Sequence, residues 1–333
     1  MPERMAPFGV VEIGIDRMNE GLDLFKIREN DPLTAGTKAG DYQGHHLNAA
    51  WHAREGLWIS GGLWDRHVSD AADTYLYTSW QVAGQYRFID AQGSRPAMAL
   101  RLSAWGNRAA VTESSTPVNV PGAILSTVKV TEPTDQQLQA DLIATWIVTP
   151  SWDVSGFVSV GSNRLSYGGL SATTSRNGCN YQLRFSGNDI YGILIPPCAT
   201  KGGIIQQFFD SSGDYGVDVA KEIAWSGTFM QLGFNGVWRS GPWTLQSAYL
   251  FHAAQREAVD AILASRGKNS HTQNHSISLE SDYRLLTNLS VFARAQYSSS
   301  LLVNDLPVTY NSSTAARFGS KYSLFSMGLR ALF

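Results

Sequence analysis

The chain is poor in charge and lacks long apolar runs. Only 16% of its 333 residues are charged, against roughly 25% in an ordinary soluble domain. The 26 Lys and Arg residues nearly balance the 28 Asp and Glu residues. Without a basic excess, a nucleic-acid partner is not expected. No run of about eighteen apolar residues occurs, which excludes a helical membrane protein.

Several enzyme signatures are also absent. The sequence contains no phosphate-binding Gly-rich loop followed by Lys, no H-E-x-x-H and no C-x-x-C, so we assign no catalytic residue, no metal ligand and no cofactor. The opening stretch MPERMAPFGV has no apolar core of a secretory signal. Because other features indicate an exported protein, we expect that a leader was removed or that the start is misassigned.

Cysteine is scarce, and its two occurrences are close in sequence. Cys179 and Cys198 lie in one segment rich in Gly, Ser, Asn and Pro. A disulfide closing this loop of about twenty residues would contribute roughly 3 kcal/mol by restricting the unfolded chain. We predict the disulfide, since exported loops favour it; two unrelated free thiols are the alternative.

Aromatic residues and glycine are plentiful, and apolar and polar residues alternate along most of the chain. From Phe325 to Phe333 every second residue is apolar, while Ser326 and Arg330 face the other way. A helix would scatter these residues around its circumference. The same alternation occurs in segments 10–16, 76–88, 98–104, 137–148, 152–160, 230–239, 244–252, 277–284 and 289–298. Each of these segments is predicted to be an amphipathic β-strand.

Three features favour a transmembrane antiparallel β-barrel over a soluble β-sandwich. The predicted strands have about ten to fifteen residues, which suits a tilted crossing of a bilayer. Aromatic residues lie near strand ends, as in an interfacial girdle: Phe88, Trp146, Trp152, Trp238, Trp243 and Tyr283. Connections are short near 54–56, 90–96, 149–151, 239–242 and 286–288, and long near 17–44, 109–134, 164–200, 254–271 and 301–320. Short periplasmic turns and long extracellular loops are typical of such barrels.

The alternation of short and long connections also predicts the strand number. The short turn near 54–56 joins two strands in addition to the ten alternating segments, and an even pattern requires two more, which we place at 203–209 and 215–223. The total becomes fourteen, with twelve or sixteen as alternatives. Residues 1–7 then form an N-terminal segment, and 8–333 form a single barrel domain. This leaves no room for an N-terminal plug.

The last strand resembles the terminal strand of bacterial outer-membrane β-barrel proteins, the porin-like class, because it ends in Phe333 after alternating apolar residues. No specific family within that class is identified. The resemblance implies a location in the Gram-negative outer membrane, among lipid and lipopolysaccharide. It also implies that Phe333 is part of the signal read by the barrel-assembly machinery.

Charged residues of both signs fall on the predicted inner face. We predict that nine of them line a pore: Glu12, Arg87, Arg101, Asp141, Glu280, Asp282, Arg284, Arg294 and Arg330. Opposed charges across a narrow pore would order water and polar solutes. Alternatively, the charges pair and brace the wall, as Arg294 with Glu280, or Arg330 with Glu12 after closure of the barrel.

The preferred function is a channel for passive diffusion of small hydrophilic solutes. The loop holding both cysteines either folds into the mouth and sets the exit width or packs outside. A second hypothesis is a barrel that exports or anchors a surface polysaccharide, with sugar rings stacking on Trp64, Tyr75, Tyr77 and Trp105. A third is an outer-membrane hydrolase that uses His46 or His52, although no acidic partner for them is evident.

Overall fold

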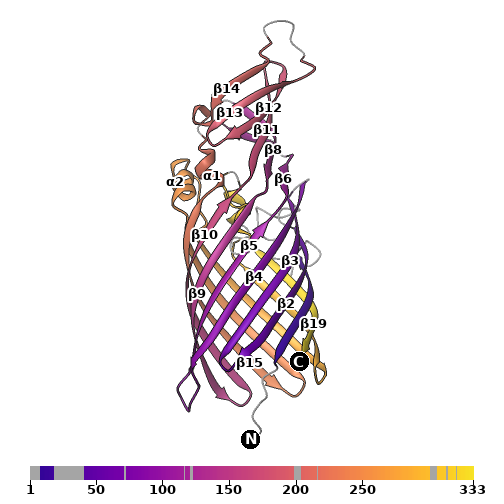
Figure 1. The fold of residues 1–333 in the computed structure, drawn as a ribbon, viewed down its shortest axis with the longest axis vertical. Coiled ribbons are helices and arrows are strands. Elements are labelled where there is room, and N and C mark those ends of the chain that lie inside the picture. Colours follow the sequence, from indigo (N-terminus) through magenta and orange to yellow (C-terminus); the bar gives the residue numbers. More distant parts are fainter. Residues whose placement is uncertain are drawn as a thin grey trace.

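The barrel wall consists of twelve antiparallel strands, paired in the closed order β1-β19-β18-β17-β16-β15-β10-β9-β5-β4-β3-β2 (Figure 1). The computed structural model describes residues 8–18, 41–70, 73–115, 117–120, 123–198, 204–215, 217–300, 306–312, 314–319 and 321–333. The wall strands are β1 (Gly9–Met18), β2 (Asp41–Arg54), β3 (Leu57–Asp70), β4 (Asp73–Ile89), β5 (Ala97–Arg108), β9 (Thr134–Thr149), β10 (Trp152–Ser166), β15 (Ser226–Ser240), β16 (Trp243–Gln255), β17 (Gln273–Leu286), β18 (Leu289–Ser298) and β19 (Tyr322–Leu332). None of the helices among these residues is long and apolar enough to cross a bilayer.

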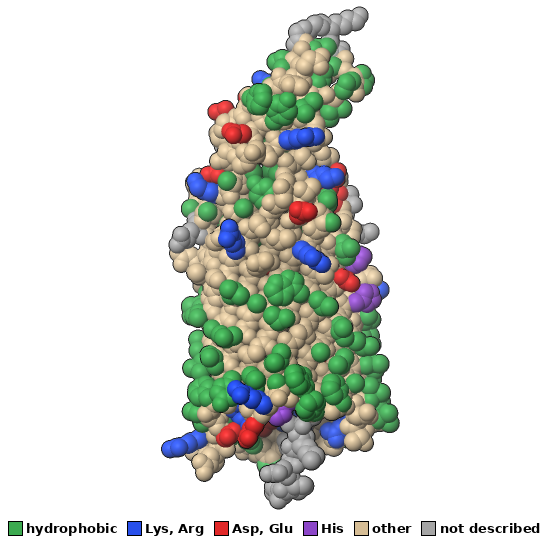
Figure 2. Space-filling model, in the orientation of Figure 1, with side chains coloured by type: hydrophobic (Ala, Val, Ile, Leu, Met, Phe, Trp, Pro, Cys, Tyr) green, Lys and Arg blue, Asp and Glu red, His purple; other side chains and the backbone are tan. Residues whose placement is uncertain are grey.

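The two faces of the wall follow the alternation in the sequence. On β1, Ile13 and Ile15 are 50% and 43% exposed on the outside, while Glu12 and Asp16 are 7% and 4% exposed on the inside. Because successive side chains in a strand point to opposite faces, one pattern sets both surfaces. On the face drawn in Figure 2, apolar side chains are consequently numerous over the barrel part of the molecule.

The first and last strands close the barrel. β1 pairs with β2 on one side and with β19 on the other. The backbone groups of Gly9 and Phe333 exchange two hydrogen bonds, 2.8 and 3.1 Å long. β1 begins and β19 ends at the same end of the barrel as the short turns (Figure 1).

Aromatic side chains gather near these short turns. The rings of Trp152 and Trp238 lie 6.4 Å apart, and those of Trp243 and Tyr283 lie 4.7 Å apart. Each pair joins two neighbouring strands at the turn end of the wall. Their position matches the girdle expected at one membrane interface.

A second sheet projects beyond the opposite end of the barrel (Figure 1). Its strands are β6 (Val111–Ser114), β7 (Val118–Val120), β8 (Ala123–Thr131), β11 (Gly169–Arg176), β12 (Cys179–Ser186), β13 (Asp189–Ile195) and β14 (Gln207–Ser211). We call it the projecting sheet. Strands β8 and β11 precede β9 and follow β10 almost directly in the chain, and they pair with each other above the barrel.

The prediction of fourteen wall strands is therefore wrong. Within the predicted strand 203–209, residues 207–209 begin β14, an edge strand of the projecting sheet. Within 215–223, the short helix α1 spans Val219–Ile223. Residues 203 and 216 lie outside the described part. The two extra strands were placed to keep an even pattern of connections, whereas β10 pairs directly with β15 in the wall and the strands between them in sequence, β11 to β14, belong to the projecting sheet.

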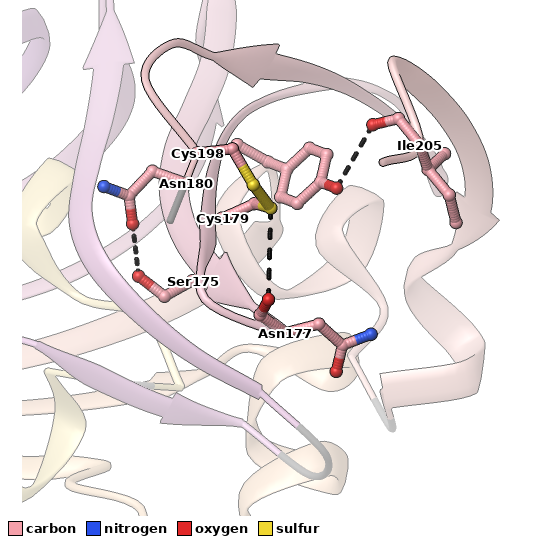
Figure 3. Close-up of a disulfide and its surroundings, with 7 residues drawn as sticks. Ser175, Asn177, Cys179, Asn180, Cys198 and Ile205 are labelled. Atoms are coloured by element: carbon pink, nitrogen blue, oxygen red, sulfur yellow. Dashed lines mark hydrogen bonds between the residues drawn. A yellow bond between two sulfur atoms is a disulfide. The ribbon is translucent and has the colours of Figure 1, made fainter. Parts of the chain in front are cut away.

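The predicted disulfide joins Cys179 to Cys198 in the projecting sheet (Figure 3). Cys179 is 4% exposed and belongs to an apolar cluster with Tyr181, Leu183 and Ile190. The hydroxyl of Tyr181 donates a hydrogen bond to the carbonyl oxygen of Ile205, 3.1 Å away. The covalent bond thus ties the segment after β13 to the start of β12.

We expect the double substitution of Cys179 and Cys198 by Ser to destabilise the projecting sheet by about 3 kcal/mol, because the unfolded loop regains its freedom. Limited proteolysis should cut residues 169–211 faster, while the barrel keeps its heat-modifiable gel mobility. Equal protease resistance of the variant and the wild type would contradict this expectation.

Candidate functional site

An ionic network joins the inner faces of four neighbouring strands, β1, β17, β18 and β19. We call it the seam network, because it crosses the pairing that closes the barrel. Arg330 lies 2.9 Å from Glu280 and 2.9 Å from Asp282, and its Nε donates to Glu12 at 3.1 Å. Arg294 lies 2.6 Å from Glu280 and 3.6 Å from Glu12. The structure thus places these five of the nine predicted pore-lining residues in one cluster.

The seam network is shielded on one side by an aromatic ring. The guanidinium groups of Arg330 and Arg294 lie 5.1 and 5.5 Å from the ring centre of Phe292. The side chains of Glu12 and Glu280 are each 9% exposed, whereas that of Arg294 is 32% exposed. Every carboxylate is paired, as buried charge requires. The arginines keep part of their surface toward the barrel axis.

His46 on β2 extends this network. Its Nδ1 lies 2.9 Å from Asp16, and its Nε2 lies 3.2 Å from Glu12. A Cβ at Gly14 would approach the ring to 2.5 Å, so glycine provides the space for it. The sequence analysis missed these acidic partners, although the pairing of β1 with β2 places Gly14 opposite His46.

A second group of charges lies on the opposite wall. Arg101 on β5 pairs with Asp141 on β9 at 2.6 Å, and the Asp141 side chain is fully buried. Gln139 and Ser159 also donate hydrogen bonds to Asp141. The side chain of Arg101 remains 36% exposed. Since it points inward, space for water adjoins it inside the barrel.

The two remaining predicted pore residues lie near the short turns. Arg87 forms a 2.7 Å ion pair with Asp90, and both side chains are largely exposed. Arg284 is exposed and makes no ion pair within the described ranges. The structure therefore does not bring these two arginines into either charge cluster. A further pair near this end, Arg239 with Asp153, was not singled out from the sequence.

The connection between β18 and β19 lies across the opposite end, the mouth of the barrel. We call Leu306–Gly319 the mouth segment; within it, residue 313 is not described. Leu306 is completely buried in an apolar cluster that includes Tyr77 of β4 and Tyr322 of β19. The backbone N–H of Val308 donates to Asp135 of β9 at 3.1 Å. One part of the segment is thus fastened to the β4–β9 side.

The next part of the mouth segment is fastened to a different side of the mouth. Tyr310 is completely buried against Trp225, and its carbonyl oxygen accepts the indole N–H at 2.8 Å. The Arg256 guanidinium lies 3.9 Å from the Tyr310 ring centre. Phe318 packs on that ring 4.9 Å away. The helix α2 (Glu257–Ser265) completes the cluster through Val259 and Leu263.

An ion pair with a buried carboxylate supports the same region. Arg266, after α2, lies 2.9 Å from Glu222 of α1. The hydroxyl of Ser312 also donates to Glu222, and the Lys268 ammonium donates to the Ser312 carbonyl oxygen at 3.3 Å. The sequence analysis treated 301–320 as an exterior loop. The sequence analysis missed this packing because residues 301–320 show no strand periodicity. The aromatic residues Trp225 and Tyr310 were the sequence features that could have indicated a buried cluster.

The projecting sheet, by contrast, carries the disulfide away from the mouth (Figure 1). Of the two readings left open for this loop, packing outside the barrel agrees with the structure. Residues 169–195 form strands β11 to β13 there. The expectation that this loop folds into the mouth is not met.

The aromatic residues suggested as sugar platforms are engaged with other side chains. Tyr77 is 3% exposed beside Leu306, and the ring centres of Tyr75 and Tyr77 lie 6.5 Å apart. The ring of Trp105 lies 5.9 Å from that of Phe229. Arg66 lies over Trp64 at 5.5 Å. His52, the second histidine of the hydrolase hypothesis, stacks on Trp58 at 5.0 Å.

Comparisons with known proteins agree on architecture and differ in function. No family model matches the chain, and no curated protein matches it. The translocator domain of the autotransporter NalP from Neisseria meningitidis has a TM-score of 0.47 at 10% identity, over 98% of this chain and 87% of that one. The CymD monoaromatic hydrocarbon channel has a TM-score of 0.41 at 11% identity, over 99% of this chain and 90% of that one. Outer membrane phospholipase A from Escherichia coli has a TM-score of 0.37 at 10% identity, over 99% of this chain and 93% of that one. These solved structures are outer-membrane β-barrel proteins, the class that the last strand resembles, and no particular family is identified.

We expect Arg330→Met to destabilise the barrel by about 3 kcal/mol, because it leaves the carboxylates of Glu12, Glu280 and Asp282 short of a buried partner. Arg284→Met is the matched control, since that arginine is exposed and lies outside the network. Urea unfolding of both variants in the same micelles measures the difference. Equal stability of the two variants would show that the network is not needed for closure.

Acid should loosen the mouth segment through His271, which lies just before β17 and whose backbone N–H donates a hydrogen bond to the Tyr310 hydroxyl at 3.3 Å. Burial, followed by the Arg256 cation, holds the pKa of His271 below its ordinary value of 6.5. His271 therefore binds a proton at higher pH when the mouth segment is released than when it is packed. The contribution of this histidine to the stability of the packed segment is complete above pH 6.5 and declines as the pH falls below that value. Labelling of a cysteine at the fully buried Ala315 position should accelerate on acidification. His271→Gln should remove most of this acceleration, and an unchanged acceleration would exclude His271 as its source.

Proposed function

We propose that the protein is an outer-membrane channel for passive diffusion of small hydrophilic solutes, with the mouth segment as its closing element. Its surroundings would be outer-membrane lipid and lipopolysaccharide, and the barrel-assembly machinery would insert it by reading Phe333. Phe333 is 62% exposed at the end of the wall, which leaves its side chain accessible. The Gram-negative setting follows from the same proposal.

The outer surface supports a position within a bilayer. Leu63, Leu138 and Val160, on three different strands, are 56%, 63% and 64% exposed. In water, such a continuous apolar surface would favour association. In a bilayer it contacts lipid chains, while the closed pairing leaves no unpaired strand edge in the wall.

The observation that carries the channel proposal is the exposure of charged groups inside the wall. Arg101 and Arg294 lie on opposite walls, and their side chains remain 36% and 32% exposed although both point inward. In a barrel whose interior is filled with side chains, these two charged groups would be fully buried or absent. A twelve-stranded wall is also wider than the eight-stranded barrels whose interiors side chains fill.

Inward charges of the two signs are balanced around the wall. The strand register places these acidic residues on the inner face: Glu12, Asp16, Asp135, Asp141, Asp153, Glu280 and Asp282. It places these arginines there as well: Arg66, Arg87, Arg101, Arg239, Arg284, Arg294 and Arg330. A lumen without an excess of one sign does not concentrate one kind of ion, so small ions and neutral solutes would both pass by diffusion.

The alternative functions have weaker support. Both ring nitrogens of His46 are occupied by carboxylates, so neither is free to activate a nucleophile. The aromatic residues proposed to stack on a polysaccharide contact other side chains instead. Single-channel recording distinguishes conduction from both alternatives.

In planar bilayers the wild type should show long closed periods with brief openings, because the mouth segment is fastened at two sites. Substituting Leu306 and Tyr310 by Ala removes two completely buried side chains, each substitution weakening the closed state by about 3 kcal/mol. The open fraction should therefore rise at least tenfold.

Ile124→Ala provides the matched control, because Ile124 is a 58% exposed apolar residue of the projecting sheet. It should gate as the wild type does. A wild-type and double-variant barrel that both insert correctly and never conduct would overturn the channel proposal. A double variant that conducts with wild-type gating would overturn the role of the mouth segment only.

A further inference from the structure

Two arginines project outward from the wall, beyond the apolar belt on the side of the mouth. Arg108 is the last residue of β5, and Arg164 lies near the end of β10. Both side chains are exposed, and neither forms an ion pair or side-chain hydrogen bond with another residue in the described ranges. Figure 2 shows Lys and Arg side chains above the green belt on the face that carries these strands.

The strand register brings the two arginines close together. Arg164 pairs with Gln136 of β9, and Gln136 pairs with Gly106 of β5. Arg108 lies two residues beyond Gly106. Two strand spacings and two residues separate the arginine Cα atoms by about 12 Å. Both long side chains can therefore reach one anionic group held between them.

The surface between the arginines is polar and supplies further donors. Thr134 pairs with Arg108 on one side and with Ser166 on the other. The hydroxyl groups of Thr134 and Ser166 lie 2.8 Å apart and are exposed. The exposed Gln136 side chain lies on the same face. Guanidinium, hydroxyl and amide groups together suit phosphate oxygens.

The surface immediately below is apolar. On the same outward face, Leu138 follows Gln136 along β9 and is 63% exposed; on β5, Leu102 is 58% exposed. The nearby carboxylate of Asp65 lies two strands away from Arg108 and is not paired with it. It accepts a hydrogen bond at 3.4 Å from Thr78, which lies on the strand between them. A cationic, hydrogen-bonding patch directly above an apolar one complements a molecule with a phosphorylated head and acyl chains.

We propose that Arg108 and Arg164, with Thr134, Gln136 and Ser166, bind the headgroup of a phosphorylated lipid in the outer leaflet. The acyl chains would lie along Leu138 and Leu102. This site rests on the proposed position of the barrel in a membrane and is independent of conduction. It would fix the height and rotation of the mouth relative to the bilayer surface.

Native mass spectrometry of the full chain in maltoside micelles tests the site, with dioleoyl phosphatidic acid and dioleoyl phosphatidylcholine as probes. We expect the wild type to retain the phosphatidic acid preferentially. The double variant Arg108→Gln, Arg164→Gln should bind it about tenfold more weakly, since it loses charge-assisted hydrogen bonds. Arg184→Gln is the matched control, because that exposed arginine lies on β12 of the projecting sheet.

Unchanged lipid preference in the double variant would overturn the site. So would an equal loss in the Arg184→Gln control, which would indicate an effect of net charge alone. Displacement of the bound lipid by inorganic phosphate at equal concentration would assign the arginines to a free anion instead. Each variant is first tested for heat-modifiable mobility and conductance. A barrel that conducts and lacks lipid preference contradicts the lipid site and leaves the channel proposal standing.

Discussion

The structure depends on the closure of the wall by backbone hydrogen bonds between β1 and β19. Without this pairing, two strand edges would expose unpaired N–H and C=O groups, which a bilayer does not tolerate. The seam network lies on the inner side of the same pairing, where Glu12 is directly opposite Arg330. A Cβ at Gly328 would come within 2.0 Å of the Ile13 carbonyl oxygen, so close packing at the seam requires glycine there. Closure therefore joins residues from the two ends of the sequence into one charged cluster.

The interior combines fixed charge near the middle of the wall with a packed segment at the mouth. The two regions use different physical chemistry: the charge clusters consist of paired ions beside open space, whereas the mouth segment is held by completely buried side chains such as Leu306 and Tyr310. Paired charges in a wall cost little when their partners are preorganised on rigid strands. A segment held at a few apolar contacts can leave its site without disturbing that wall. This separation allows the lumen and its closure to be altered independently.

Much of the fold was predictable because a strand has a period of two. The inward and outward faces of β1, β17, β18 and β19 agree with the prediction. The positions of the short turns in the sequence and the disulfide agree with it as well. The strand number was wrong because two further wall strands were assumed between β10 and β15, which in fact pair directly with each other. The length of a connection does not show that it contains a second sheet, and Gln207–Ser211 pairs with β13 in the projecting sheet. The acidic partners of His46 arise only from the register of β1 with β2. The packing of the mouth segment depends on contacts between Tyr310 and residues far away in sequence, which no local pattern encodes.

Cysteine accessibility in a membrane tests the central claim most directly, namely that the wall is apolar toward lipid and wet toward its axis. Ser278 and Leu279 are neighbours on β17 that point to opposite faces, and Leu279 is 60% exposed on the outside. The chain has no free cysteine to interfere within its described residues. A membrane-impermeant, water-soluble thiol reagent should modify a cysteine at position 278 once the mouth segment is loosened, and should leave one at position 279 unmodified in lipid vesicles. Preferential modification at position 279 would place the apolar face in water and contradict the account.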